Sequence, residues 1–525
     1  MKAPFLFGDH MKTFTLRNLR FPARPEFSLA EETSRKLGLP ASAFEIVRIV
    51  RQALDTRRRG HPVFDFTLQL SFSGEVPRHK DLTPLETSPL RECAPIQAQD
   101  PHPFIIGMGP AGLFCALAMV ENGLQPWLFD RGDALEQRAD KVNDFWRHGT
   151  LDEDSNVQCG EGGAGAFSDG KLTARGGDPV LQMVLEQMLR FGAPAEIAWS
   201  ALPHLGTDGI RALVRKLREY LLLKGCRFFH HHTLEDLELS GGKLTRLKLN
   251  SEWHSPELAV LALGNSARST WPLLQRRGVD LEPKPFALGF RIEHIQAWIN
   301  ALVYGQGNWA EFLGPASYRL TAPTGFTFCM CPGGQVIAAA SEQGGVVTNG
   351  MSFAARAGLY ANSAIVTPVS ATDYGAGLWD GVELQRRLEK LSFRETFLAP
   401  VQSARAFLCG TEDPDPPQST YTPGTYASDL SRLFPAEISS RLRDTLIRFD
   451  QVLPGFSQNA VLIAPETRTS SPIRITRHKQ GLHCVGIENL YPVGEGSGYA
   501  GGISSSAADG WRLGTRIRQG NALIN

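Results

Sequence analysis

A glycine-rich turn at residues 107–112 constrains the fold more than any other part of the chain. The apolar residues 104–106 lead into Gly107, Gly109 and Gly112, and an apolar helical run follows to residue 120. A buried strand, a tight turn and a helix in this order are typical of dinucleotide-binding folds. In such folds the N–H groups at the positive end of the helix face a pyrophosphate. The sequence therefore predicts that a nucleotide sits on this turn.

The context of the turn strengthens this interpretation, because a lone G-x-G-x-x-G pattern is weak. A second apolar run, residues 127–129, ends at Asp130, at the distance where an acidic side chain takes ribose hydroxyls. The later sequence is consistent with further elements of the same sheet. It has a helical pattern at 208–223, then short strands, and then a return strand at 258–263 that ends in Gly264. Among them, His230 to His232 could suggest a metal, but no matching ligands accompany them and we predict no metal site.

Composition describes a soluble globular chain without a marked charge bias. The chain has 525 residues, of which 42% are hydrophobic and 21% charged, with a formal net charge of +0. This length predicts two or three domains, and the charge gives no argument for nucleic acid or membrane. The eight cysteines show no paired framework, no apolar run approaches ~20 residues, and residues 1–13 lack the apolar core of a signal peptide. We therefore expect a cytoplasmic protein.

Residues 13–90 read as a small separate α/β unit. Strands are predicted at 13–21, 45–55 and 63–72, and a capping box at residues 28–31 opens a helix that ends near Gly38. Residues 91–101 suit a linker. The run Arg57 to Arg59 is either a basic patch for RNA or an acidic partner or, more commonly in such sequences, a solvated hairpin tip.

Two further glycine-rich segments flank the sheet. Residues 156–171 hold five glycines between Gly160 and Gly170, so the backbone can wrap a ligand closely, and Lys171 supplies a positive charge; the alternative is a flexible surface loop. Near the C-terminus, residues 494–502 place Glu495 after a strand and before a final helix, where a carboxylate can meet polyol hydroxyls. An NAD protein needs no such second grip, whereas an FAD protein does.

The middle segment, residues 281–464, lacks a second glycine fingerprint. It contains the charged run Arg291 to His294 and the pair Cys329 and Cys331. A disulfide across one intervening residue closes a tight, strained ring, so a buried structural role is favoured over a redox couple. Residues 411–424, rich in Pro, Asp and Thr, suggest a mobile loop.

These motifs resemble the bacterial FAD-dependent dehydrogenase-like flavoproteins, a family of the glutathione-reductase-type two-dinucleotide-binding superfamily. The segments that carry the resemblance are residues 107–112, 156–171, 203–208, 284–286, 291–294, 328–334, 349–352, 466–472 and 494–502. The resemblance implies a fold and FAD, with NAD(P)H as an electron donor or acceptor left open, and supplies no substrate.

We thus predict an α/β protein: a Rossmann-like FAD-binding domain with an inserted α+β substrate domain and a small N-terminal α/β domain. The expected boundaries are 1–98, 99–280, 281–464 and 465–525, the second and fourth segments forming the FAD domain. The predicted cofactor-binding residues are Gly107, Gly109, Pro110, Ala111, Gly112, Asp130, Arg131, Arg138, Gly160, Gly162, Gly163, Ala164, Gly165, Ser168, Lys171, Leu234, Gly264, Asn265, Gly494, Glu495, Gly501, Gly502 and Ile503.

The predicted function is an FAD-dependent oxidoreductase that transfers a hydride between a small organic substrate and FAD. Its candidate catalytic residues are Arg291, Glu293, His294, Arg468 and Lys171, because charges in apolar segments are costly unless paired or used. The alternative for these residues is an Arg–Glu network that joins two domains. Alternative functions are a flavoprotein whose FAD is structural or sensory, and an FAD-dependent RNA-modifying enzyme, although no nucleic-acid or membrane partner is expected.

Overall fold

The computed structural model describes residues 12–85, 94–172 and 178–519. Parts of two predicted segments lie outside the described residues. They are residues 1–11 at the N-terminus and residues 91–93 of the predicted linker, which include Cys93. Within these ranges, no helix combines the length and the apolar character needed to cross a membrane.

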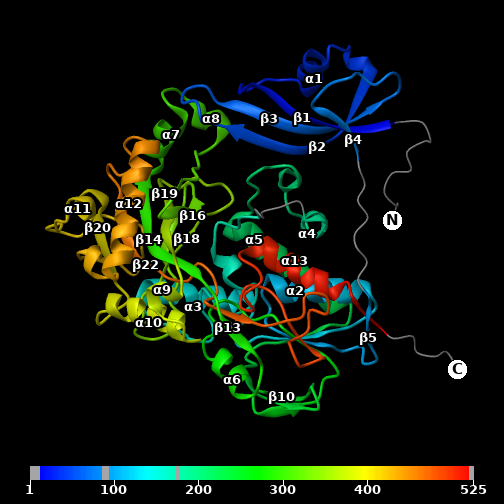
Figure 1. The fold of residues 1–525 in the computed structure, drawn as a ribbon, viewed down its shortest axis with the longest axis vertical. Coiled ribbons are helices and arrows are strands. Elements are labelled where there is room, and N and C mark those ends of the chain that lie inside the picture. Colours follow the sequence, from blue (N-terminus) through cyan, green and yellow to red (C-terminus); the bar gives the residue numbers. More distant parts are fainter. Residues whose placement is uncertain (1–11, 86–93, 173–177, 520–525) are drawn as a thin grey trace.

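The N-terminal domain is a four-stranded antiparallel sheet with one helix, at the top of Figure 1. Its elements are β1 (Lys12–Pro22), α1 (Leu29–Leu37), η1 (Ala41–Ala43), β2 (Phe44–Asp55), β3 (Val63–Phe72) and β4 (Leu82–Pro84), in the spatial order β2-β3-β1-β4. The Ser28 hydroxyl accepts from the Glu31 N–H at 3.3 Å, and Gly38 ends α1 in the left-handed conformation. The alternating side chains of β3 are buried, as their period of two predicts.

The second domain, which we call the nucleotide-binding domain after its predicted role, is built on a five-stranded parallel sheet, in the order β24-β12-β6-β7-β8. Its strands are β6 (Phe104–Ile106), β7 (Trp127–Phe129), β8 (Arg227–Phe229), β12 (Ala259–Leu261) and β24 (Leu490–Pro492). One face packs on α2 (Pro110–Glu121), α5 (Gly206–Leu223) and α13 (Ile503–Gly514). The other packs on β9 (Leu234–Ser240), β10 (Lys243–Leu249) and α6 (Thr270–Arg276), with β11 (Glu252–His254) at the edge of the meander.

Shorter elements complete this domain and tie in its C-terminal part. They are α3 (Leu135–His148), η2 (Ala164–Phe167), α4 (Pro179–Arg190), η3 (Ala195–Ala198), and the parallel pair of β5 (Ile96–Ala98) with β25 (Ile517–Gln519). The strand β24 joins the sheet from beyond residue 465, so both predicted parts of the nucleotide-binding domain contribute to one sheet.

The inserted domain contains a seven-stranded sheet in the order β15-β16-β19-β14-β22-β20-β21. Its strands are β14 (Phe286–Ile295), β15 (Thr321–Ala322), β16 (Gly325–Cys331), β19 (Tyr360–Val369), β20 (Ala399–Ser403), β21 (Thr425–Ala427) and β22 (Val461–Glu466). A side ribbon pairs β17 (Gln335–Ala338) with β18 (Thr348–Met351), and β13 (Leu281–Pro283) pairs with β23 (Ile473–Ile475).

Helices of the inserted domain cover its sheet. They are α7 (Gln296–Tyr304), α8 (Trp309–Leu313), α9 (Ala371–Tyr374), α10 (Asp380–Ser392), α11 (Ala404–Cys409), η4 (Leu430–Arg432) and α12 (Ala436–Val452). The core under α7 and α12 is apolar and aromatic. The predicted mobile loop at 411–424 is anchored in part, because Tyr421 is buried and the Thr420 N–H donates to Glu293 at 2.9 Å.

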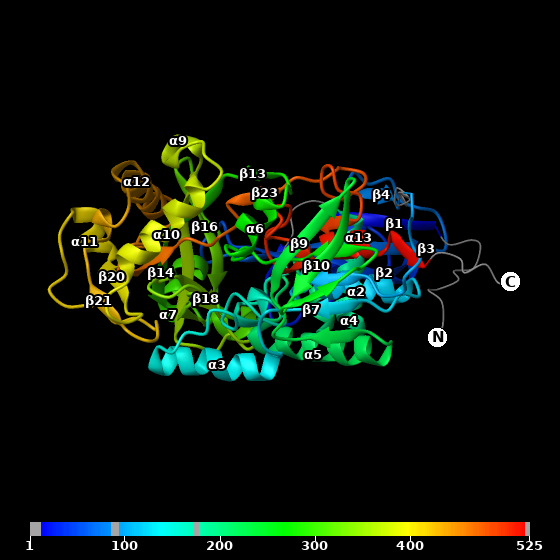
Figure 2. The ribbon, with the colours of Figure 1, turned by 90° about the horizontal axis from the view of Figure 1, so that it is seen from below.

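The three domains touch one another. Figure 2 shows the inserted and nucleotide-binding domains side by side, and the indole N–H of Trp146, on α3, donates to the Ala338 carbonyl at 2.9 Å. The N-terminal domain contacts both of the others: the Gln52 N–H donates to the Trp199 carbonyl at 2.7 Å, and the Gly60 N–H donates to the Tyr304 carbonyl at 2.8 Å. The run Arg57 to Arg59 therefore lies at a hairpin tip next to α7.

Candidate functional site

The predicted turn connects β6 to α2 with the expected close approaches. A Cβ atom at Gly107, whose φ is +111°, would lie 2.4 Å from the Ala262 carbonyl oxygen, and one at Gly112 would lie 2.0 Å from the Gly107 oxygen. Both positions therefore require glycine. At Gly109 the nearest atom to such a Cβ is the Cα of Gly163, at 3.7 Å. The turn thus leaves open space in front of the first turn of α2, where N–H groups lack helical partners.

Asp130 follows β7 and lies beside this turn. Its carboxylate accepts from the Met108 N–H at 2.9 Å and from the Gly132 N–H at 3.0 Å. These bonds fix its orientation, and a carboxylate retains further acceptor capacity.

The glycine-rich loop lies against the turn and is held from behind by Arg138 of α3. The Gly162 N–H donates to the Met108 carbonyl at 2.8 Å. The buried Arg138 guanidinium donates to the carbonyl oxygens of Asn156, Val157 and Glu161 at 2.8, 3.0 and 2.6 Å, and burial lowers its pKa to about 10. The loop is therefore fixed in shape.

The C-terminal glycine segment also borders the site. The Glu495 carboxylate accepts from the Asn265 side-chain amide at 3.0 Å and from the Gly502 N–H at 3.3 Å. Burial raises the pKa of Glu495. Because α13 begins at Ile503, its positive end also faces this region.

These three segments share one cavity of about 2210 Å³, which extends to the inserted sheet and the N-terminal domain. The predicted cofactor residues that line it are Gly107, Gly109, Pro110, Ala111, Asp130, Arg131, Gly160, Gly163, Ala164, Gly165, Ser168, Lys171, Leu234, Gly264, Asn265, Glu495, Gly501, Gly502 and Ile503.

Four predicted cofactor residues have packing roles and lie outside this lining. Gly112 allows α2 to approach β6, Arg138 binds loop carbonyls, and Gly162 takes a positive φ. A Cβ at Gly494 would lie 2.7 Å from the Ala111 side chain. These four residues therefore shape the site from behind, and their part in cofactor binding stays a prediction.

Lys171 lines the cavity within a buried charge cluster. Its ammonium lies 2.8 Å from Asp169, which also binds Arg356 at 2.7 Å. Burial alone would lower the pKa of Lys171, but Cys331, Cys329 and Asp169 together raise it. Lys171 is therefore a fixed cation at the cavity wall.

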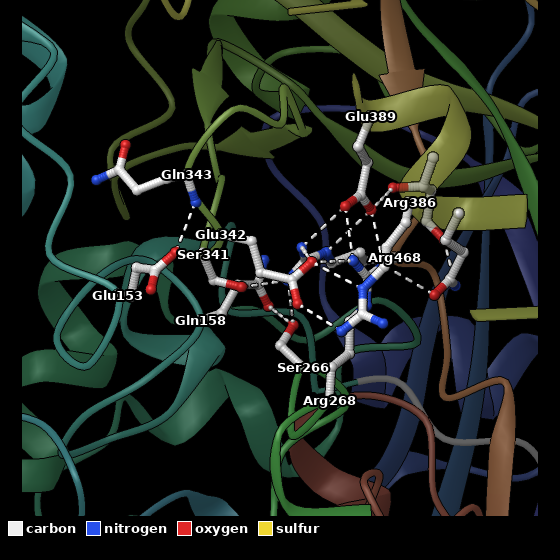
Figure 3. Close-up of polar contacts among 12 residues, drawn as sticks. Glu153, Gln158, Ser266, Arg268, Ser341, Glu342, Gln343, Arg386, Glu389 and Arg468 are labelled. Atoms are coloured by element: carbon white, nitrogen blue, oxygen red, sulfur yellow. Dashed lines mark hydrogen bonds and ion pairs between the residues drawn. The ribbon is translucent and has the colours of Figure 1, made fainter. Parts of the chain in front are cut away.

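Arg468 lines the cavity too, but its guanidinium belongs to the network in Figure 3. It donates to Glu389 of α10 at 3.0 Å, and Arg268 from the nucleotide-binding domain donates to the same carboxylate at 2.7 Å. Burial would raise the pKa of Glu389, but Arg468 and Arg268 lower it well below its usual range. The predicted alternative, an ion network between domains, describes Arg468.

The other three catalytic candidates lie on β14, away from the cavity lining. Arg291 is buried and pairs with Glu466 at 3.3 Å, and Glu293 accepts from Thr420. The His294 Nε2–H donates to the Phe456 carbonyl at 2.7 Å in an aromatic core. Glu293 and His294 therefore lie off the cavity lining, so their contact with substrate stays a prediction, and Arg291 is part of a buried network.

Several lining residues escaped prediction. Cys329, Lys284 and Arg356 line the cavity, as do Gln52 and Thr56 of the N-terminal domain. The segment 328–334 stands out by its composition, but its proximity to Lys171 spans about 160 residues of sequence and leaves no local signal.

Residues 285–469 match the family model described as "FAD-dependent protein, C-terminal domain-like". An uncharacterized protein from Clostridium beijerinckii is 36% identical over 516 residues, which cover 93% of this chain and 95% of that protein. Two solved structures are similar to this chain. The halogenase PltM is 11% identical, with 79% of this chain and 68% of that chain covered and a TM-score of 0.36. Glycine oxidase from Bacillus cereus is 10% identical, with 79% of this chain and 94% of that chain covered and a TM-score of 0.30. Their TM-scores are too low to inform this chain.

The family model defines the class as FAD-dependent proteins. Within this class, the chain belongs to the family of the Clostridium beijerinckii protein.

Proposed function

We propose that the chain is an FAD-dependent oxidoreductase that transfers a hydride between a small organic substrate and FAD. The observation that supports this proposal is the single cavity shared by the glycine turn and the inserted sheet. A cofactor on the turn would extend toward groups of the inserted domain, which is where a substrate can meet it. Membership of the glutathione-reductase-type superfamily is part of this proposal.

The residues of the cavity fit the two ends of FAD. Gly107 and Gly109, with the first turn of α2, suit the pyrophosphate, and Asp130 suits the adenosine ribose. Glu495 and the positive end of α13 suit the ribityl chain and the ring. When bound, FAD would supply the acceptor or donor of the hydride.

The chain's own residues would bind and orient the substrate. Lys171 gives the cavity a positive charge that attracts an anionic group, such as a carboxylate. Because Arg468 is bound to Glu389, it would hold its part of the cavity wall in place and so act as a positioning residue. We propose NAD(P)H as one candidate electron donor.

Anaerobic titration of the purified holoprotein tests the proposal. Small hydroxy, amino and carbonyl compounds, as well as NADH and NADPH, would be added singly while the flavin absorbance is recorded. We expect at least one to bleach the oxidised flavin band. A bound flavin that dithionite reduces but no compound of the panel does would contradict turnover and favour a structural or sensory FAD.

A further inference from the structure

The strand β16 is irregular at the point where it reaches the cavity. Its pairing with β19 shifts register between Phe328 and Cys331, and Cys329 takes a φ of +46°. Such a conformation is uncommon for a residue with a side chain, and bulges beside active sites re-aim side chains. Here the irregularity places Cys329 in the cavity lining, half-buried, whereas Cys331 is fully buried.

Two cations lie beside the sulfur of Cys331. The Lys171 ammonium is 3.9 Å from Cys331 Sγ, and the Arg291 Nη2 atom is 3.7 Å from the same sulfur. Arg291 also donates to the Cys329 carbonyl at 3.0 Å. A hydrogen bond from Cys331 lowers the pKa of the Cys329 thiol, against burial, and the charges of Lys171 and Arg291 lower it further. The cluster therefore stabilises one thiolate and keeps the second sulfur protonated.

The second thiol lies close to the first. The Cys331 thiol donates to the Cys329 carbonyl oxygen at 3.2 Å, which turns its sulfur back toward residue 329. A thiol next to an attacking thiolate can resolve the mixed disulfide that the thiolate forms. This arrangement favours the redox couple, which the sequence pattern places behind a structural role.

We propose that Cys329 and Cys331 form a thiol pair that exchanges with small disulfides in this cavity, with Cys329 as the nucleophile. The Cys329 thiolate attacks one sulfur of R–S–S–R, the S–S bond breaks, and one RS⁻ leaves. Cys331 then loses its proton to solvent and attacks the Cys329 sulfur, which releases the second RS⁻. The two thiols lose two electrons and two protons, and R–S–S–R becomes two R–SH.

The product ring is tight, so external thiols reduce it readily and the exchange is reversible. The other buried cysteines differ, because burial raises the pKa of Cys115, Cys226 and Cys484. The proposal stands without turnover of the flavin, since the thiol step needs only the disulfide.

Reaction of the holoprotein with 5,5′-dithiobis(2-nitrobenzoate) at pH 6.5 tests the pair. Cys93 and the exposed Cys409 would be replaced by Ser to simplify the kinetics. We expect a fast phase, at least about tenfold faster than a simple peptide thiol, that releases two equivalents of thionitrobenzoate and leaves no adduct by mass. Cys329→Ser should abolish this phase, and Cys331→Ser should release one equivalent and retain an adduct on Cys329.

Lysine 171 variants separate this chemistry from a structural effect. Lys171→Met should move the midpoint of the pH profile of the fast phase up by about one unit, because loss of one nearby positive charge raises a thiol pKa by about that amount, and Lys171→Arg should restore the profile. Flavin content, measured on each variant, separates failure of the thiol proposal from failure of cofactor binding. A fast phase that survives Cys329→Ser, an adduct retained by the wild type, or an unchanged pH profile in Lys171→Met would overturn the proposal.

Discussion

Single residues at the glycine turn separate folding from cofactor binding. Gly109 has room for a side chain within the protein, since a Cβ there would lie 3.7 Å from its nearest neighbour, whereas Gly107 does not. Gly109→Val should therefore fold normally, with a melting temperature close to that of the wild-type apoprotein, but lose its FAD by filling the pyrophosphate space. Gly107→Ala, by contrast, should fail to fold well.

The flavin content of purified Gly109→Val, read by absorbance against protein concentration, checks this expectation. A variant that keeps stoichiometric FAD would contradict the placement of the pyrophosphate.

Because His294 is buried, it makes the stability of the protein depend on pH in the acidic range. Burial lowers its pKa to about 4 from 6.5, so the folded protein binds this proton less well than the unfolded chain. The contribution of His294 to the free energy of unfolding is therefore fully present above pH 6.5 and is lost as the pH falls toward 4. Between pH 7 and pH 4.5 we expect a loss of about 2–3 kcal/mol that His294→Gln lacks, while its amide keeps a donor for the Phe456 carbonyl.

Urea unfolding of both proteins at the two pH values measures this difference. Equal losses in the two proteins would show that other groups carry the acid sensitivity.

At the scale of elements, α10 joins two domains through one carboxylate. Glu389 faces both Arg268 and Arg468, and all three side chains are buried. Glu389→Gln removes the buried counter-charge that the two guanidinium groups share and leaves them only the half-buried Glu342, so we expect a loss of about 3 kcal/mol in the free energy of unfolding. Arg386, on the same helix, is a matched control, because its pairs with Glu342 and Glu383 are partly exposed.

Arg386→Gln should cost no more than about 1 kcal/mol, and chemical denaturation compares the two variants. Losses of similar size in both would contradict a central role for Glu389.

The elements differ in how far their sequence predicts them. The turn between β6 and α2 is a local signal, because glycine spacing and apolar runs specify it directly. The strand β14 gives no comparable local signal, because it lies in the interior of a seven-stranded sheet and nearly all of its side chains are buried. A period of two cannot then tell which face meets a cavity, and for this reason the sequence did not indicate that Glu293 and His294 lie off the cavity lining. Contacts such as Lys171 with Cys331 depend on tertiary packing alone.

On the scale of the whole molecule, the N-terminal domain forms part of the cavity wall through β2. Gln52 bonds with residues 199–201 from the free edge of its sheet, donating to the Trp199 carbonyl and accepting from the Ala201 N–H at 2.8 Å. Proline is tolerated at such an edge. Gln52→Pro should therefore preserve the sheet but release this junction, and Gln52→Ala should keep it.

Hydrogen exchange reads out the junction: the Ala201 amide should exchange at least about tenfold faster in Gln52→Pro, while amides of β1 and β3 stay protected. Unchanged exchange at Ala201 would mean that other contacts hold the N-terminal domain in place.

The central claim is that FAD lies in the shared cavity, and a crystal structure of the purified holoprotein tests it most directly. We predict flavin density with the pyrophosphate at Gly107 and Gly109, the adenosine ribose at Asp130, and the ring between Glu495 and the wall that carries Lys171 and Cys329. Density for the flavin elsewhere, or a ring turned away from the inserted domain, would contradict it.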